Sequence, residues 1–71
     1  DVDMIINLIS KKYSNKKINK IDGLKIDFKD SWVQLRKSNT EPIIRIYSEA
    51  KSQDEANMLS GKFIDEVNSF I

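Results

Sequence analysis

Three successive segments of the chain alternate apolar and polar side chains, which is the periodicity of a half-buried β-strand. They cover residues 24–28, 32–37 and 43–50, and a shorter candidate strand covers residues 18–21. Asp22-Gly23, a dipeptide typical of tight turns, stands between the short strand and the first long one. The pattern predicts a meander of antiparallel hairpins.

Both ends of the chain carry the three- and four-residue periodicity of amphipathic helices. Residues 3–13 place four apolar side chains on one stripe: Met4, Ile5, Leu8 and Ile9. Near the other end, Ser52 and Glu55 form an S-x-x-E capping box that would satisfy two backbone donors. The helix after it carries one apolar face: Ala56, Leu59, Phe63, Val67 and Phe70. Gly61 interrupts this helix, and we expect it to mark close packing against the sheet.

The order of helix, strands and helix predicts an α+β domain. Its simplest form is an antiparallel sheet of three to four strands with two helices packed on one face. At 71 residues the chain is expected to form a single domain. It has no cysteine and no histidine, which excludes disulfides and argues against a zinc site of the usual ligand types.

The balance of charge argues against partners that are strongly anionic. Twelve basic residues face eleven acidic ones, for a net charge of +1. A nucleic-acid-binding module is therefore disfavoured, and no RRM-type aromatic motif is present. No apolar run approaches the roughly 20 residues of a membrane helix. We expect neither a nucleic-acid nor a membrane partner, and a cytoplasmic location.

Residues 36–45 read RKSNTEPIIR and gather hydrogen-bond donors between two permanent positive charges. Strand periodicity places Arg36 and Arg45 on the same face of one hairpin, the face turned away from the helices. Hydroxyl, amide and backbone N–H groups of Ser38, Asn39 and Thr40 could bind an anion with the planar fork of Arg36. The same residue types crowd ordinary turns, so a turn without a ligand is the alternative reading.

Two further residues of this segment have expected roles in its shape. We expect the Glu41 carboxylate to point away from any bound anion, either pairing with Arg45 or accepting N–H groups of the loop. Pro42 has no N–H to donate and holds Glu41 in extended geometry. Its expected role is to fix the exit of the loop into the next strand.

A longer pattern surrounds this segment. Asp22-Gly23 precedes an alternating strand, Trp32 begins the next, R-x-S-N-T-E-P-x-x-R follows over residues 36–45, and Tyr47, Glu49 and Ala50 precede the capped helix. Residues 18–67 thereby resemble the C-terminal domain (domain 4) of the α-D-phosphohexomutase superfamily, the phosphoglucomutases and phosphomannomutases. The resemblance implies a TATA-box-binding-protein-like fold.

The resemblance also implies which residues form a site. It implies substrate-phosphate contacts for Arg36, Ser38, Asn39 and Thr40, and supporting roles for Glu41, Pro42 and Arg45. Lys37 departs from the family pattern, in which proline is common at this position.

The activity implied belongs to a parent enzyme rather than to this chain. Such an enzyme is an isomerase that interconverts hexose 6-phosphate and hexose 1-phosphate through a phosphoserine, with Mg²⁺ as cofactor. The family's phosphoserine loop carries a histidine and its metal loop reads D-G-D-x-D, and this chain contains neither. We therefore expect no catalytic residue, no metal ligand and no cofactor in this chain. Its expected partners are a sugar phosphate and the remaining domains of the same polypeptide, from which we take it to be a piece.

Two alternatives to a phosphoglucomutase/phosphomannomutase domain stay open. Asn39 together with Tyr47 favours that branch over the phosphoglucosamine mutases, many of which carry glycine at the position of Asn39. A phosphoglucosamine mutase C-terminal domain is nevertheless one alternative. A structural or interaction domain without a ligand is the other.

Overall fold

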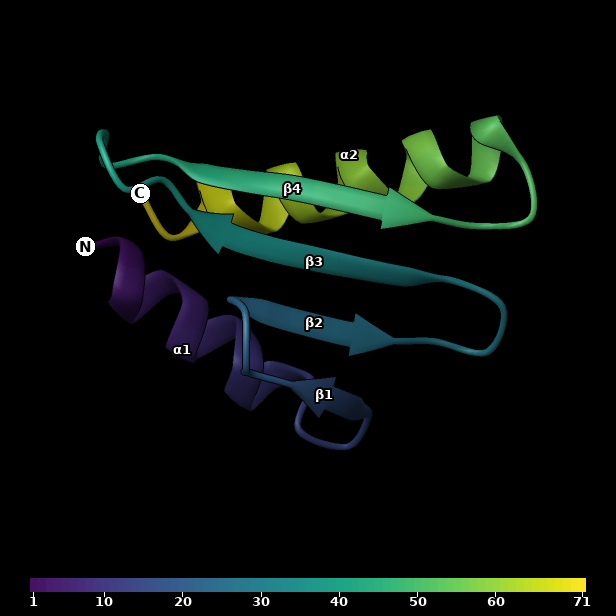
Figure 1. Ribbon diagram of the computed structural model, residues 1–71, viewed down its shortest axis with the longest axis horizontal. Helices are drawn as coiled ribbons and strands as arrows, with labels where there is room; N and C mark the ends of the chain where they lie inside the picture. The colour runs from purple at the N-terminus through teal and green to yellow at the C-terminus, as the bar shows by residue number, and fades with distance from the viewer.

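The computed structural model describes residues 1–71 and contains two helices and one four-stranded sheet (Figure 1). The elements in chain order are α1 (Val2–Lys12), β1 (Lys17–Asn19), β2 (Leu24–Asp27), β3 (Trp32–Lys37), β4 (Ile44–Glu49) and α2 (Gln53–Ser69). The predicted α+β class is confirmed. Neither helix has the length and apolar character that crossing a membrane requires.

The sheet is a meander in which every strand is antiparallel to its neighbour, in the order β1-β2-β3-β4. The β3–β4 hairpin is the longest pairing and runs from Trp32 opposite Glu49 to Lys37 opposite Ile44. Its loop lies at one end of the molecule, and the β2–β3 turn lies at the other (Figure 1). The sheet therefore presents the loop of residues 38–43 at an exposed tip.

The core lies between one face of the sheet and both helices. Alternate residues of β2 and β3 are completely buried: Leu24, Ile26, Val33 and Leu35. They form one cluster with Ile5 and Ile9 of α1 and with Phe63 and Val67 of α2. Both helices therefore cover the same face, as predicted, and the opposite face of the sheet carries no helix.

The buried stripe of α1 differs from the prediction. Met4 and Leu8 are 52% and 38% exposed, whereas Ile5, Ile9 and Tyr13 are buried. The predicted stripe combined two neighbouring columns of side chains, Met4 with Leu8 and Ile5 with Ile9. A helix packed on a sheet buries the column that faces the sheet, and Tyr13 continues that column by one more turn.

The predicted features of α2 are confirmed in part. The Ser52 hydroxyl caps the helix by accepting from the Glu55 N–H at 3.1 Å, but the reciprocal bond from the Glu55 side chain does not form. Phe70 follows the last turn and is 36% exposed. The expected close packing at Gly61 is wrong, since a Cβ atom there would have no neighbour within 4 Å.

The first strand is shorter than predicted and begins one residue earlier. It ends at Asn19, whose side-chain oxygen accepts from the Ile21 N–H at 2.8 Å. This local bond takes a donor that a continued strand would have used in the ladder. The chain then turns at Gly23, which has a positive φ of 71°.

Candidate functional site

The β3–β4 loop is a tight connection whose backbone is held at two points. The Ser38 N–H donates to the Ile43 carbonyl at 3.0 Å, which extends the hairpin by one pairing beyond Lys37 and Ile44. The Ile43 N–H donates to the Glu41 carbonyl at 2.8 Å and closes a three-residue turn around Pro42. Residues 39–41 form the tip of the loop.

The tip retains donors that no protein group uses. Ser38 Oγ lies 3.4 Å from both the Thr40 amide and the Thr40 hydroxyl, which are long and weak contacts. The backbone amides of Asn39 and Glu41 make no hydrogen bond within the protein, and neither does the Asn39 carboxamide. These groups are exposed and available to a ligand.

The loop and the adjacent strand ends surround a hollow of about 320 Å³, which we call the tip hollow. It is lined by Arg36, Lys37, Ser38, Asn39, Thr40, Arg45 and Tyr47. All four residues for which phosphate contacts were expected therefore lie around one space, with Arg45 beside them. The lining contains no carboxylate, so the hollow suits an anion.

Two arginines face each other across the hairpin at this hollow. Arg36 and Arg45 are directly opposite in the β3–β4 register. Like charges in this arrangement cost roughly 0.2–1 kcal/mol of stability. Arg45 has no acidic partner, and Arg36 has one, Asp22, whose Oδ1 lies 3.3 Å from the arginine Nε. The concentration of positive charge on this tip is thus only partly neutralised.

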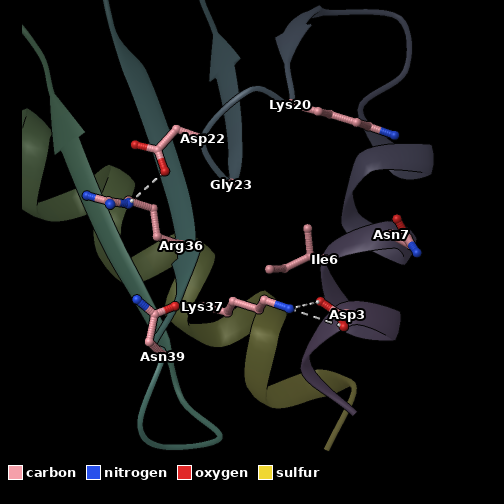
Figure 2. A pocket seen from close by; sticks show the side chains of 9 residues that line it. All are labelled: Asp3, Ile6, Asn7, Lys20, Asp22, Gly23, Arg36, Lys37 and Asn39. Atoms are coloured by element: carbon pink, nitrogen blue, oxygen red, sulfur yellow. Dashed lines mark hydrogen bonds and ion pairs between the residues drawn. The ribbon is translucent and has the colours of Figure 1, made fainter.

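Lys37 borders the tip hollow, but its side chain is directed to the other side of the hairpin. It leaves β3 opposite to Arg36, and its ammonium group lies 3.1 Å from Asp3 Oδ1 at the start of α1 (Figure 2). A second hollow, of about 440 Å³, opens there between α1 and the sheet. It is lined by Asp3, Ile6, Asn7, Lys20, Asp22, Gly23, Arg36, Lys37 and Asn39 (Figure 2). The ion pair with Asp3 partly neutralises the charge of Lys37 on this side of the hairpin.

Glu41 and Pro42 do not line the tip hollow. They border a separate surface depression together with Asp1 and Val2 at the start of α1. The expected pair of Glu41 with Arg45 is wrong, because Glu41 takes part in no ion pair and its side chain accepts no hydrogen bond from the loop. Its carboxylate is nevertheless absent from the walls that surround the arginines.

Asp22 lies next to the site, and the sequence analysis did not predict this position for it. Its sequence signal was that of a turn, and its position beside Arg36 follows from the register in which Leu24 pairs with Leu35. No local pattern specifies that register, so the contact depends on the folded sheet.

A metal site is not apparent among these residues. No three acidic, histidine or cysteine side chains come together anywhere in the structure. The residues present therefore do not fit the Mg²⁺ that a parent phosphohexomutase is expected to use, and no step involving a metal is assigned to this chain.

Comparison with known proteins places the chain in a family. The family described as "Phosphoglucomutase/phosphomannomutase, C-terminal domain" matches residues 6–66. The chain belongs to the family of phosphoglucomutase/phosphomannomutase C-terminal domains.

Individual relatives carry several mutase names. The chain is 62% identical over 40 residues, 56% of its length, to a phosphoglucomutase/phosphomannomutase of Thermococcus kodakarensis. It is 39% identical over 70 residues, 99% of its length, to a probable phosphoglucosamine mutase of Pyrococcus horikoshii. It is 48% identical over 60 residues, 82% of its length, to a phosphoglucosamine/phosphogalactosamine mutase of Sulfurisphaera tokodaii. The matches span 9%, 16% and 13% of these three relatives, so their names do not by themselves assign a substrate.

Proposed function

We propose that this chain binds the phosphate group of a hexose-phosphate substrate as the C-terminal domain of a phosphohexomutase. One observation carries the proposal: the tip hollow joins two arginines, three hydroxyl side chains and a carboxamide around a space without a carboxylate. The relatives' mutase names support the same reading.

The chemistry of a phosphate monoester matches these groups. It carries close to two negative charges, and its oxygens mainly accept hydrogen bonds. The Arg36 fork can bind two oxygens at once, and Ser38, Asn39 and Thr40 offer side-chain and backbone donors. Each bond to a charged acceptor contributes roughly 1.5–3 kcal/mol, much of it offset by the costs of association. We expect a dissociation constant for the isolated chain in the millimolar range, which corresponds to about −4 kcal/mol.

In the parent enzyme the bound phosphate would be the one that does not react. Holding it fixes the sugar with the opposite end toward the reacting groups, which lowers the entropic part of the barrier. The phosphoserine and Mg²⁺ that carry out phosphoryl transfer would be supplied by the remaining domains of the polypeptide. This chain alone would then bind the substrate without converting it.

The choice of sugar is a separate question. Phosphoglucomutase/phosphomannomutase activity is the first candidate for the parent enzyme, because Asn39 together with Tyr47 resembles that branch, and both residues border the tip hollow. Phosphoglucosamine mutase activity is the second, since several relatives carry that name. Recognition through the phosphate alone predicts that glucose 1-phosphate and glucosamine 1-phosphate bind this chain with similar affinity.

A titration followed by amide chemical shifts tests the proposal. Glucose 1-phosphate added to the ¹⁵N-labelled chain should shift the amides of residues 36–45, with saturation in the millimolar range. Glucose without phosphate should leave them in place. No response to glucose 1-phosphate at tens of millimolar would contradict binding by this chain and favour a structural domain.

Charge-matched variants separate the site from general electrostatics. Arg45→Gln removes an unpaired cation from the tip hollow, and Lys29→Gln removes an unpaired cation at the opposite end of the sheet. Arg45→Gln should weaken binding about tenfold, the effect of losing one or two charge-assisted bonds, whereas Lys29→Gln should change it less than twofold. Equal weakening by both variants would mean that net charge, rather than this hollow, attracts the sugar phosphate.

A further inference from the structure

The turn between β1 and β2 packs closely against β3. A Cβ atom at Gly23 would lie 2.3 Å from the Leu35 carbonyl oxygen and 3.1 Å from Arg36 Cγ. The Gln34 side chain donates to the Asp22 carbonyl at 2.7 Å. Two contacts therefore hold this turn against the residues immediately before Arg36.

The same turn carries the acidic partner of Arg36. Asp22 Oδ1 lies 3.3 Å from Nε, the nitrogen nearest the side-chain stem (Figure 2). This contact leaves the two terminal guanidinium nitrogens without a protein partner. Asp22 borders the hollow on the α1 side but is not part of the tip hollow's lining.

An arginine without such a partner loses much rotamer freedom when it binds a ligand, and this loss weakens binding. A partner on Nε restricts the stem torsions before the ligand arrives. The carboxylate has a second, opposite effect, because its negative charge repels a nearby phosphate. The two effects predict changes of opposite sign when Asp22 is replaced.

We propose that Asp22 is a positioning residue for Arg36, held in place by Gln34 and by the close approach of Gly23 to β3. The proposal rests on the proposed function, because it explains how the guanidinium group is oriented for the phosphate. The β1–β2 turn then contributes to the anion site, although it precedes the R-x-S-N-T-E-P segment in the sequence.

Affinity is the first test. Asp22→Ala should weaken glucose 1-phosphate binding about two- to fivefold, the range expected from losing an exposed charge pair. Asp22→Asn, which keeps an oxygen but no charge, should fall between wild type and Asp22→Ala. Asp27→Asn is the matched control, since Asp27 pairs with Lys25 at 3.7 Å near the opposite end of the sheet. Unchanged or tighter binding by Asp22→Ala would overturn the proposal and leave repulsion as the effect of this carboxylate.

The second test measures how ordered the Arg36 side chain is, and this measurement needs no ligand. The ¹⁵N relaxation of the Arg36 Nε–H group should report a restricted side chain in wild type and a mobile one in Asp22→Ala, with backbone shifts outside residues 20–24 and 34–37 unchanged. Equal mobility in both proteins would overturn the proposal. An ordered Arg36 in a wild-type chain that binds no sugar phosphate would contradict the proposed function while leaving the positioning contact supported.

A double-variant cycle separates positioning from a general loss of structure. In an Arg36→Gln background the cation that pairs with Asp22 is absent, so Asp22→Ala should no longer weaken the binding that remains. A persistent two- to fivefold effect in that background would show that Asp22 acts through something other than Arg36, and would overturn the proposal.

Discussion

The two glycines of this chain differ in the space available to a side chain. Gly23 combines a positive φ of 71° with a backbone oxygen 2.3 Å from where a Cβ would lie, so both conformation and space require glycine. Gly61 lies inside α2 with open space around the missing side chain. The same substitution should therefore have opposite signs at the two positions.

Gly23→Ala should destabilise the fold by about 2 kcal/mol or more. Alanine disfavours positive φ, and its methyl group must displace either the turn or β3. Urea denaturation followed by circular dichroism measures the change. A loss below 0.5 kcal/mol, on the order of an ordinary surface substitution, would contradict the close approach.

Gly61→Ala should stabilise the fold by about 0.5–1 kcal/mol. Alanine restricts the unfolded chain and has the higher helix propensity, and no neighbour has to move. The same denaturation experiment applies. A destabilised variant would mean that another group occupies the space beside Gly61.

The residues of the loop were largely predictable, and their environment was not. Arg36, Ser38, Asn39 and Thr40 adjoin one hollow because strand alternation and a short loop leave few alternatives. Glu41 was assigned a partner on the basis of charge, but its direction follows from the turn around Pro42. Asp22 reaches Arg36 through the register between β2 and β3, which no short stretch of sequence encodes.

At the scale of elements, one side-chain cluster joins the end of α1 to the last turns of α2. Glu66 accepts hydrogen bonds from Lys12 and from the Tyr13 hydroxyl, and its side chain is only 11% exposed. Burial would raise the pKa of Glu66, but the bonds from Lys12 and Tyr13 outweigh it and hold the pKa below the ordinary 4.5. Burial, followed by the bond to Glu66 and its charge, raises the pKa of Tyr13 well above 10.

These shifts predict how stability depends on pH. A carboxyl group with a lowered pKa in the folded state stabilises the fold above its ordinary pKa, and the contribution is lost as pH falls below about 4.5. Glu66→Gln should cost about 1 kcal/mol at pH 7, and the difference from wild type should shrink as pH falls from 4.5 toward 2. Tyr13, with its raised pKa, favours the folded state below pH 10, and this contribution is lost as pH rises above 10.

Thermal unfolding across pH 2–11 checks both the loss of stability at low pH and the loss at high pH. Asp65→Asn is the matched control, because Asp65 lies beside Glu66 on α2 and takes part in no ion pair or hydrogen bond. A difference between Glu66→Gln and wild type that stays constant down to pH 2 would contradict an ionised Glu66 as the source of the stabilisation.

The elements themselves followed from periodicity, with β3 predicted to the residue over 32–37. Alternation and the tight connections restrict the fold to an antiparallel meander. Tyr13 was missed as a core residue although it lies within the predicted helix of residues 3–13, four residues after Ile9 on the buried column. Its burial depends on packing against Phe28 and Phe63, which are far away in sequence.

At the scale of the whole molecule, ligand binding and folding are linked. A ligand that binds only the folded chain stabilises it by about 1.4 kcal/mol at ten times its dissociation constant. For a domain of this size, glucose 1-phosphate at that concentration should raise the melting temperature by about 5–10 °C. Scanning fluorimetry measures the shift, with glucose as the neutral control. An equal rise for Arg45→Gln would show that the stabilisation arises outside the tip hollow.

The position of the loop at the end of the long axis has a mechanical consequence. The molecule extends 32 Å along that axis, and the β3–β4 loop lies at one end of it (Figure 1). Both termini lie at this same end of the molecule (Figure 1), and Asp1 and Val2 border one depression with Glu41 and Pro42. A rigid rotation of the molecule about its N-terminal end would therefore change the direction in which the loop points more than its position, with no change inside the sheet.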